Sequence, residues 1–329
     1  MKKLVVVLFV ALSLFSCEEK GKKQHKSLGK SEGRWNSLLI VMPNDDWKGA
    51  LGDSIRTVFA SPVKPLPNFE PHYTMTQISN ELFSGYLTKQ RNILIVNVKK
   101  DAKKPFLYKE NAFAKPQQVF QLNGDKATII EQLTKHKDEM LQTLQTKEMN
   151  AFNKEQNNTP NAATNTALKK IGLQLQVPSS FELAENKGDF FWFIKDIKNG
   201  YSNLVVYDFP MAETPFDSIP NYILKKRNEI GKKHIPGQLP NTYVVSETQF
   251  SPYVSQTALA GYDVFISKGL WKIQGDFMGG PYINYTIKDT LNKRYLVLEG
   301  FVFAPNVHKR NYLFELEAAI KTAKIIKKE

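Results

Sequence analysis

YDVFISKGLWKIQGDFMGGPYINYTIKDTLNKRYLVLEGFVF, residues 262–303, is the stretch that decides the fold of the second half of the chain. It holds four segments rich in β-branched and aromatic residues, at 262–267, 270–274, 282–287 and 294–303, separated by short polar or glycine-rich breaks. Such segments are typical of β-strands, and short breaks join strands that pair antiparallel. The stretch therefore predicts a mostly antiparallel sheet.

The sequence on either side of this stretch extends the same pattern. Further strands are predicted at 173–177, 190–194, 204–209 and 243–245, with a turn at Asn199-Gly200. Helices are predicted from Pro220 to about Lys233, with Ser218 as a possible cap, and over the last apolar face of Leu313, Leu316, Ile320 and Ala323. Residues 167–329 are thus expected to form an α+β sandwich domain.

The first half alternates strands and helices. Buried strands are predicted at 38–42 and 93–98, further strands at 73–78 and 117–122, and short helices at 48–59 and 81–89. Asp125 begins the clearest helix, which runs to about Gln156 with its apolar residues spaced by three and four. Residues 35–166 are therefore expected to form an α/β-type domain, and the whole chain falls in the α+β class.

The first residues have the form of an export signal. Met1-Lys2-Lys3 is followed by an apolar run too short to span a bilayer, then by Ser16 and Cys17, the one cysteine of the chain. We expect residues 1–16 to be a cleaved signal peptide and Cys17 to carry diacylglycerol and palmitate, the alternative being an ordinary signal with a chance cysteine. Residues 17–34 would be a lipidated tether to the outer membrane, on a face that the sequence leaves open.

Charge limits the classes of partner. The formal charge is +13, of which the cleaved signal removes Lys2 and Lys3. A basic surface can meet anionic lipids, glycans or nucleic acid, but export and the absence of a recognisable motif make nucleic acid the poorest of these. Solvated lysines on helix faces are the structural interpretation, which we favour.

A glycine-rich segment, Gly275 to Pro281, is one candidate binding site. Gly279 and Gly280 are free to take positive φ in a turn, and Trp271 with the carboxylate of Asp276 could shape the rim of a ligand site. The structural interpretation is a hairpin with Trp271 in the core, which we favour.

Asp45, Asp46 and Trp47 are the second candidate, because they follow the carboxyl end of the first buried strand. Paired carboxylates there could bind a cation or perform acid–base chemistry, whereas the structural interpretation is an acidic helix start. Lys309 and Arg310, at the start of the last helix, are the third candidate. They would bind an anionic partner or pair internally with Glu299 or Glu315.

No coherent catalytic, cofactor or metal motif is found in the sequence. Ser54, in a Gly-Asp-Ser block, has no Asp-x-x-His partner later in the chain, and the five histidines have no ligand spacing. The glycine segment lacks the residues of a phosphate-binding loop. We expect no enzyme activity, no cofactor and no metal.

Several blocks of sequence resemble a known family. Gly269-Leu270-Trp271, Gly275 to Pro281, Glu299 to Pro305 and Lys309-Arg310 resemble the Bacteroidota envelope lipoproteins of domain of unknown function 4837, over nearly the whole exported chain. The resemblance implies an envelope lipoprotein without an assigned activity. The second half is also similar to PsbP-like and Mog1-like sandwiches, which are mostly non-enzymatic binding or assembly modules.

Three functions remain open from the sequence. The first is a non-catalytic envelope lipoprotein that binds or assembles with an envelope protein. The second is an envelope hydrolase that uses Asp45, Asp46 or Asp276, which would require two carboxylates in one cleft. The third is a carrier or sensor of an anionic small molecule near Lys309 and Arg310, which would require a deep apolar pocket beside those cations.

Overall fold

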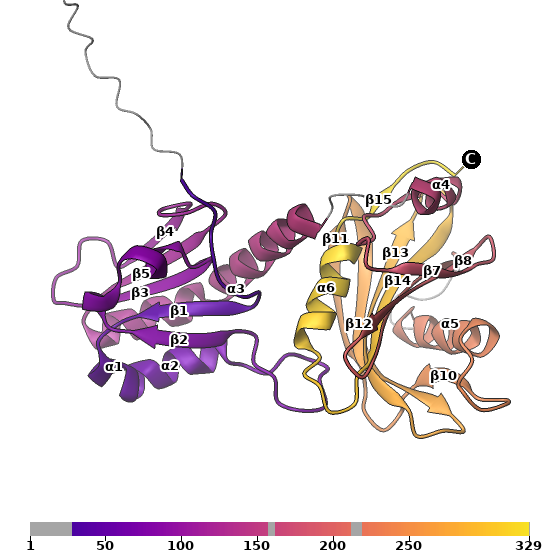
Figure 1. Ribbon diagram of the computed structural model, residues 1–329, viewed down its shortest axis with the longest axis horizontal. Helices are drawn as coiled ribbons and strands as arrows, with labels where there is room; N and C mark the ends of the chain where they lie inside the picture. Colours follow the sequence, from indigo (N-terminus) through magenta and orange to yellow (C-terminus); the bar gives the residue numbers. More distant parts are fainter. Residues whose placement is uncertain (1–27, 157–161, 212–218, 329) are drawn as a thin grey trace, which may run out of the picture.

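The computed structural model describes residues 28–156, 162–211 and 219–328, which form two domains lying side by side (Figure 1). The predicted signal peptide and Cys17 lie outside the described residues. The last residues of the predicted tether are described, and they pack on the first domain. Their backbone forms isolated parallel β-bridges there, from Lys30 to Lys115 and from Glu32 to Gln90. The α+β class predicted from the sequence is confirmed.

The N-terminal domain contains a five-stranded sheet in the order β2-β1-β3-β5-β4. The strands are β1 (Ser37–Val41), β2 (Thr74–Ile78), β3 (Asn92–Val98), β4 (Phe106–Glu110) and β5 (Gln118–Gly124). All neighbours pair in parallel except β4, which runs antiparallel to β5 at the edge. The α/β-type fold predicted for the first half is therefore present, with one antiparallel edge strand, β4, that the sequence pattern does not show.

Both faces of this sheet are covered, as a parallel sheet requires. Leu38, Ile40 and Met42 pack against α2 (Ala50–Phe59) and α3 (Lys126–Gln156), while Leu39 and Val41 pack on the other side. The helix predicted at 48–59 is present as α2, and a separate short helix, α1 (Asn44–Lys48), precedes it. The helix predicted at 81–89 is instead two short 3₁₀ turns, η1 (Asn80–Leu82) and η2 (Gly85–Lys89). Asp125 caps α3 by accepting a hydrogen bond of 2.8 Å from the Thr128 amide, as predicted.

The C-terminal domain is built on an eight-stranded antiparallel sheet in the order β10-β12-β13-β14-β9-β8-β7, with β11 also paired to β12. The strands are β7 (Glu182–Asn186), β8 (Phe190–Ile197), β9 (Gly200–Pro210), β10 (Tyr243–Ser246), β11 (Tyr253–Leu259), β12 (Tyr262–Gln274), β13 (Gly279–Asp289) and β14 (Arg294–Phe303). The segments predicted at 262–267 and 270–274 are one long strand. A small second sheet pairs β6 (Leu173–Gln174) with β15 (Lys324–Ile325).

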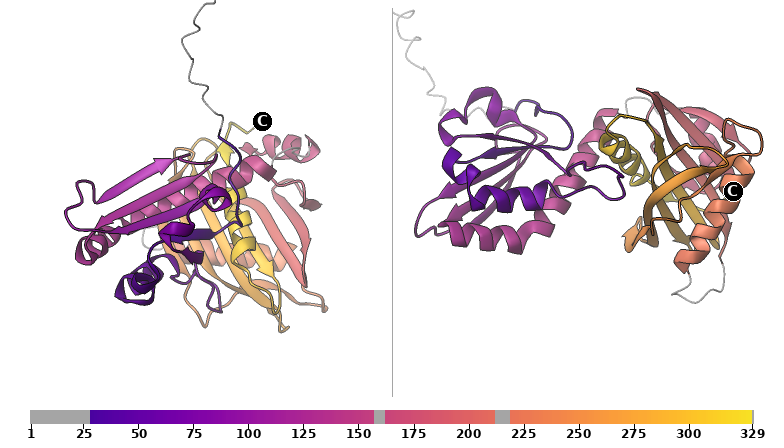
Figure 2. Two further views of the ribbon diagram at one scale, coloured as in Figure 1. Left: turned by 60° about the vertical axis from the view of Figure 1, so that its left-hand side comes forward. Right: turned by 90° about the horizontal axis from the view of Figure 1, so that it is seen from below.

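Helices cover the two faces of this sheet because its residues alternate in direction. On β14, Leu296 and Leu298 pack toward α6 (Arg310–Ile320) and α4 (Ala162–Lys170), whereas Tyr295 and Val297 pack toward α5 (Ile219–His234). The sheet is thus a middle layer with a hydrophobic core on each side. Figure 2 (right) shows α6 on the side of the sheet that faces the N-terminal domain.

The glycine-rich segment differs from its prediction. Gly275 takes the positive φ, +89°, at the turn after β12. Gly279 and Gly280 are the first residues of β13 and pair with Lys272 and Trp271. A Cβ on Gly280 would lie 2.1 Å from the Val302 carbonyl oxygen, so this glycine is required by close packing of strands and not by a turn.

The two domains are packed directly on each other. Trp35, Phe152 and Phe314 form an aromatic cluster in which Trp35 and Phe152 meet edge to face at 5.3 Å. On α3, Asn153 donates a hydrogen bond of 2.7 Å to the Ala318 carbonyl of α6. Apolar burial and a satisfied buried amide both hold α3 against α6.

Glu70, from the proline-rich loop of the first domain, caps the last helix of the second. Its two carboxylate oxygens each accept a hydrogen bond of 2.8 Å, from the backbone amides of Lys309 and Arg310. A carboxylate at a helix N-terminus satisfies unpaired amides and interacts favourably with the helix dipole. The ion pairs predicted with Glu299 and Glu315 are wrong, because those carboxylates pair with Arg227 and Lys195.

Candidate functional site

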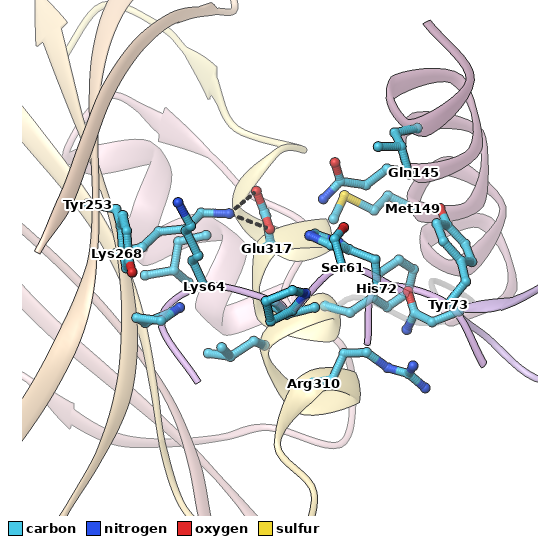
Figure 3. A pocket seen from close by; sticks show the side chains of 18 of the residues that line it. Ser61, Lys64, His72, Tyr73, Gln145, Met149, Tyr253, Lys268, Arg310 and Glu317 are labelled. Atoms are coloured by element: carbon cyan, nitrogen blue, oxygen red, sulfur yellow. Dashed lines mark hydrogen bonds and ion pairs between the residues drawn. The ribbon is translucent and has the colours of Figure 1, made fainter. Parts of the chain in front are cut away.

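A cleft of about 480 Å³ lies between the two domains, and we call it the interdomain cleft (Figure 3). The first domain contributes the loop at 61–65, His72, Tyr73 and one face of α3, while the second contributes β11, β12, β13 and α6. It is lined by Asn36, Ser61, Pro62, Val63, Lys64, Pro65, His72, Tyr73, Leu141, Gln145, Met149, Tyr253, Ser255, Lys268, Ile283, Arg310, Leu313, Phe314 and Glu317.

The inner wall of the cleft is mainly apolar. Tyr73, Met149, Ile283 and Leu313 are each at most 5% exposed and give the cleft a rigid hydrocarbon surface. Pockets for small molecules usually combine such a wall with a few polar groups that fix orientation.

Lys268 and Glu317 provide the central polar group of the cleft. The Lys268 ammonium lies 3.3 Å from both carboxylate oxygens of Glu317, and the Tyr285 hydroxyl donates a hydrogen bond of 2.7 Å to the same carboxylate. Burial alone would raise the pKa of Glu317, but Lys268 and Lys321 outweigh it and hold this pKa below its usual value. Glu317 is therefore ionised at neutral pH and keeps Lys268 in place.

Cations outnumber carboxylates in the lining. The Lys64 ammonium lies 4.3 Å above the Tyr253 ring, and Lys64 forms no ion pair with a carboxylate of the described residues. Arg310 donates a hydrogen bond of 2.8 Å to the Pro71 carbonyl. The lining contains three cations, Lys64, Lys268 and Arg310, and one carboxylate, Glu317. The cleft thus carries an excess of positive charge.

His72 lies in the cleft in its neutral form. Burial, assisted by the charge of Lys268, lowers the pKa of its imidazole from the usual value. A neutral imidazole offers one donor and one acceptor nitrogen, so His72 adds hydrogen-bonding capacity without adding charge.

The acidic candidate of the first domain lies away from this cleft. Asp46 pairs with Lys126 at 2.7 Å, Asp45 is exposed, and the Trp47 ring lies 4.4 Å from the Arg56 guanidinium. These contacts fit a structural start of α1. Ser54 donates to the Ala50 carbonyl within α2 at 2.9 Å and does not meet a base there.

The other sequence candidates gather around a second hollow of about 510 Å³, at one end of the C-terminal sheet. Trp271, Asp276, Gly279, Gly280 and Lys309 all line it. The Trp271 side chain is buried, its indole donating to the Val302 carbonyl at 3.3 Å, so the expected place in the core is confirmed. Arg310 lines the interdomain cleft, so the structure separates it from Lys309.

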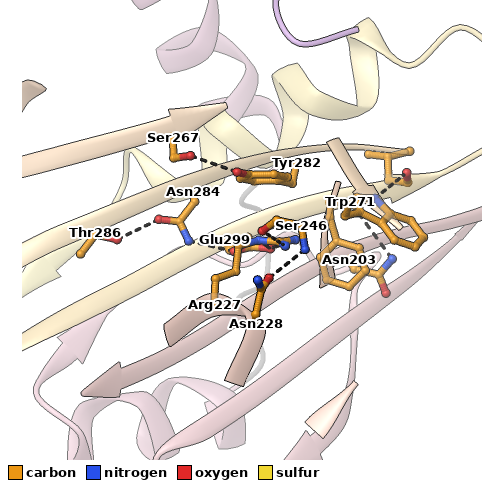
Figure 4. A network of polar contacts seen from close by, with 12 residues as sticks. Asn203, Arg227, Asn228, Ser246, Ser267, Trp271, Tyr282, Asn284, Thr286 and Glu299 are labelled. Atoms are coloured by element: carbon orange, nitrogen blue, oxygen red, sulfur yellow. Dashed lines mark hydrogen bonds and ion pairs between the residues drawn. The ribbon is translucent and has the colours of Figure 1, made fainter. Parts of the chain in front are cut away.

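A buried polar network that no sequence motif indicates lies in the C-terminal core (Figure 4). Arg227 binds Glu299 through Nε at 2.9 Å, and Glu299 also accepts a hydrogen bond of 2.8 Å from the Asn284 amide. The Nη1 atom of the Arg227 guanidinium donates a hydrogen bond of 2.9 Å to the Ser246 hydroxyl. These residues line neither hollow and bind mainly one another, which indicates a structural role. Among the described residues, no group of three or more histidines or carboxylates could hold a metal ion.

The fold and the cleft define a two-domain α+β protein with a site between its domains. Residues 160–322 match the family model of a domain of unknown function, DUF4837, which confirms the resemblance over that range. Residues 31–157 match a different domain of unknown function, DUF8532. The match to this family therefore covers the second half, and the two matched ranges meet a few residues before the domain boundary predicted at 166.

Solved structures show weak likeness. The chain is similar to LpqN of Mycobacterium tuberculosis, described as involved in cell envelope biogenesis, with 15% identity, 47% of this chain and 83% of that chain covered, and a TM-score of 0.29. It is also similar to the Ran-binding protein Mog1p of Saccharomyces cerevisiae, with 9% identity, 47% and 91% covered, and a TM-score of 0.31. No curated protein matches the sequence. In the described part of the chain, no helix has the length and apolarity needed to cross a membrane.

Proposed function

We propose that this protein is a lipid-anchored envelope protein that binds an anionic, partly apolar small molecule in the interdomain cleft, without catalysing a reaction on it. The observation that carries the proposal is the composition of the cleft. An apolar wall contributed by both domains lies beside Lys64 and Lys268, and the cations outnumber the carboxylates. A hydrocarbon body would bury against the wall, while its acidic group would meet the ammonium groups.

A ligand in this cleft would contact both domains at once. Tyr73 and Met149 belong to the first domain, whereas Lys268 and Leu313 belong to the second. Bound ligand would therefore stabilise the packing of the domains, and packed domains would favour binding. Such coupling suits a carrier or sensor that reports ligand to an envelope partner.

The cleft is tested with anilinonaphthalene sulfonate, a fluorescent probe with an apolar body and one anionic group. The chain without its leader and with Cys17→Ala is expected to bind it, and Lys268→Met is expected to weaken binding about tenfold or more. This estimate follows because a hydrogen bond to a charged group contributes about 1.5–3 kcal/mol. The measurement is a fluorescence titration at constant ionic strength.

Two controls make this test specific. Lys147→Met removes a lysine that pairs with Glu110 on the surface of the first domain, and it should leave the affinity unchanged. Ser255→Trp should fill the cleft and abolish binding without changing its charge. Equal affinities for wild type, Lys268→Met and Ser255→Trp would place the probe elsewhere and remove the support for the cleft.

The anchor is tested separately with Cys17→Ala in the full chain. Wild type is expected to appear in the membrane fraction with the added mass of its acyl chains, because two or more chains on one residue give stable anchoring. Cys17→Ala is expected to be released into the soluble envelope fraction. Mass spectrometry and fractionation measure both effects. An unmodified Cys17 in membrane-associated wild type would contradict the lipid anchor.

A further inference from the structure

The second hollow has the features of a protein-binding groove, and we call it the Phe277 groove. Its floor contains Trp271 and Phe303, and its rim carries Phe250 and Phe277 on separate loops. It is lined by Pro67, Glu247, Phe250, Leu270, Trp271, Lys272, Asp276, Phe277, Met278, Gly279, Gly280, Phe303, Pro305 and Lys309. All four sequence blocks that resemble the DUF4837 family contribute to this lining, although they are separate along the chain.

Two large aromatic side chains of the rim are held in solvent. Phe277 is 107% exposed and Phe250 is 61% exposed, so both leave their rings in water. Burying a phenylalanine ring is among the largest single gains available at an interface, and contiguous exposed apolar surface marks interaction sites. An exposed aromatic side chain beside an aromatic-lined groove therefore calls for an occupant.

The loop that carries Phe277 is fixed by local contacts. Gly275 takes a positive φ of +89°, and Asp276 accepts a hydrogen bond of 2.7 Å from the Phe277 amide. The Ile273 amide donates to the Met278 carbonyl at 2.8 Å and closes the turn. The ring is thus presented by an ordered turn, and little conformational entropy would be lost on binding.

The charge of the groove is balanced. Lys272 pairs with Glu247 at 3.3 Å, and Asp276 and Lys309 add one charge of each sign to the lining. The chain as a whole carries a formal charge of +13. Two copies of so basic a chain repel each other over most of their surface, but not at a patch where the charges cancel. An anionic bilayer, by contrast, would gain no net attraction at this patch, because Glu247 and Asp276 offset Lys272 and Lys309 there.

We infer that the occupant of the Phe277 groove is a second copy of this chain. In a two-fold symmetric pair the same patch serves both partners, so a protruding group and a receiving hollow on one patch are self-complementary. Phe277 would enter the groove of the partner subunit and lie on Trp271 and Phe303 of its floor. Glu247 and Lys272 would each face the opposite charge across the two-fold axis.

The resulting dimer is small and depends on concentration. The groove is a single hollow, so the contact belongs with the weak, transient interfaces, which bury less than about 1,200 Å². We expect dimers of the Cys17→Ala chain in solution at about 10–100 µM. Sedimentation velocity over a concentration series measures the monomer–dimer equilibrium directly.

The deciding variant is Phe277→Ser, with Leu239→Ser as a matched control. Both side chains are exposed, but Leu239 does not line the groove. Phe277→Ser is expected to raise the dimer Kd about tenfold or more, as loss of a central aromatic anchor does. Leu239→Ser should leave the Kd unchanged. Because Phe277 has no buried surface, the variant keeps its fold, which circular dichroism checks.

A second readout places the contact. With Cys17 removed the chain has no other cysteine, so Gln274→Cys introduces a single thiol at the exposed end of β12, beside the groove, and keeps Phe277 in place. The spectral lines of a spin label on this thiol are expected to broaden when the dimer forms, because the labels of the two subunits then lie close together across the two-fold axis. Monomers at the highest attainable concentration, or dimers that Phe277→Ser leaves intact, would overturn the inference. Binding to vesicles of anionic phospholipid that requires Phe277 would overturn it in favour of a membrane surface.

Discussion

Replacing Arg227 by methionine is expected to destabilise the C-terminal domain by about 3–5 kcal/mol, the usual cost of leaving one partner of a buried ion pair alone. Both side chains of the Arg227–Glu299 pair are 3% exposed. The Nε of Arg227 donates to both carboxylate oxygens of Glu299, at 2.9 and 3.0 Å. The variant would leave the Glu299 carboxyl group in the core with the Asn284 amide as its remaining hydrogen-bond donor among the described residues.

Arg227 also packs as a flat group, which adds to the expected loss. Its guanidinium lies 4.0 Å from the centre of the Tyr282 ring. Burial by itself would lower the pKa of Arg227, but Glu299 and the neighbouring tyrosines raise it above its usual value. The arginine therefore remains charged, and the energy of the pair depends on keeping both partners.

The double variant Arg227→Met with Glu299→Leu separates charge from packing. Replacing both partners by apolar residues of similar volume is often neutral, so the double variant should recover most of the lost stability. Lys226→Met is the matched control on the same helix, because Lys226 pairs with Glu229 in an exposed pair that contributes at most about 0.5 kcal/mol. Urea unfolding followed by tryptophan fluorescence measures all three. A double variant as unstable as Arg227→Met would show that the network stabilises by shape and not by charge.

The elements that the sequence predicts well are those whose side chains are buried. The parallel strand β3 and the central antiparallel strand β14 have nearly continuous burial, and hydrophobic runs show them clearly. The edge strands β4, β7 and β11 are mostly exposed along their length. Their strand geometry comes from pairing with a neighbour, which leaves no apolar pattern in their own residues.

The two candidate surfaces are less visible in the sequence because each joins segments that are distant along the chain. The cation at Arg310 was recognised, but its helix is capped by Glu70, 240 residues earlier in the chain. The interdomain cleft combines a proline-rich loop, one face of α3 and an exposed edge strand, none of which carries a motif. The Phe277 groove was predictable in part, since the sequence indicates Trp271, Asp276, Gly279 and Gly280 as the rim of a ligand site and Lys309, with Arg310, as a site for an anionic partner.

The last expected result concerns Glu148, a buried carboxyl on α3 beside the domain interface. Burial raises its pKa from the usual 4.5 to about 7, although the Asn36 amide, at 2.9 Å, and the charge of Arg91 oppose the shift. A folded-state pKa above the unfolded value means that the folded protein binds the extra proton between these two values. The contribution of Glu148 to the free energy of unfolding is therefore greatest below about pH 4.5, and it decreases as pH rises to about 7.

Glu148→Gln is expected to remove this pH dependence and to stabilise the protein by about 3 kcal/mol at pH 8, at about 1.4 kcal/mol per unit between the two pKa values. The glutamine oxygen can still accept a hydrogen bond from the Asn36 amide, so the packing of α3 is preserved.

His72 has the opposite effect on the pH dependence of stability. Burial lowers its pKa, so its contribution to the free energy of unfolding increases as pH rises. Both proteins contain His72, so its contribution is absent from the difference between their free energies of unfolding. That difference therefore reports Glu148 alone. Thermal unfolding at pH 5 and pH 8 measures it, with the exposed Glu131→Gln on the same helix as control. Parallel pH profiles for wild type and Glu148→Gln would mean that Glu148 titrates normally and that the domain interface admits water at this position.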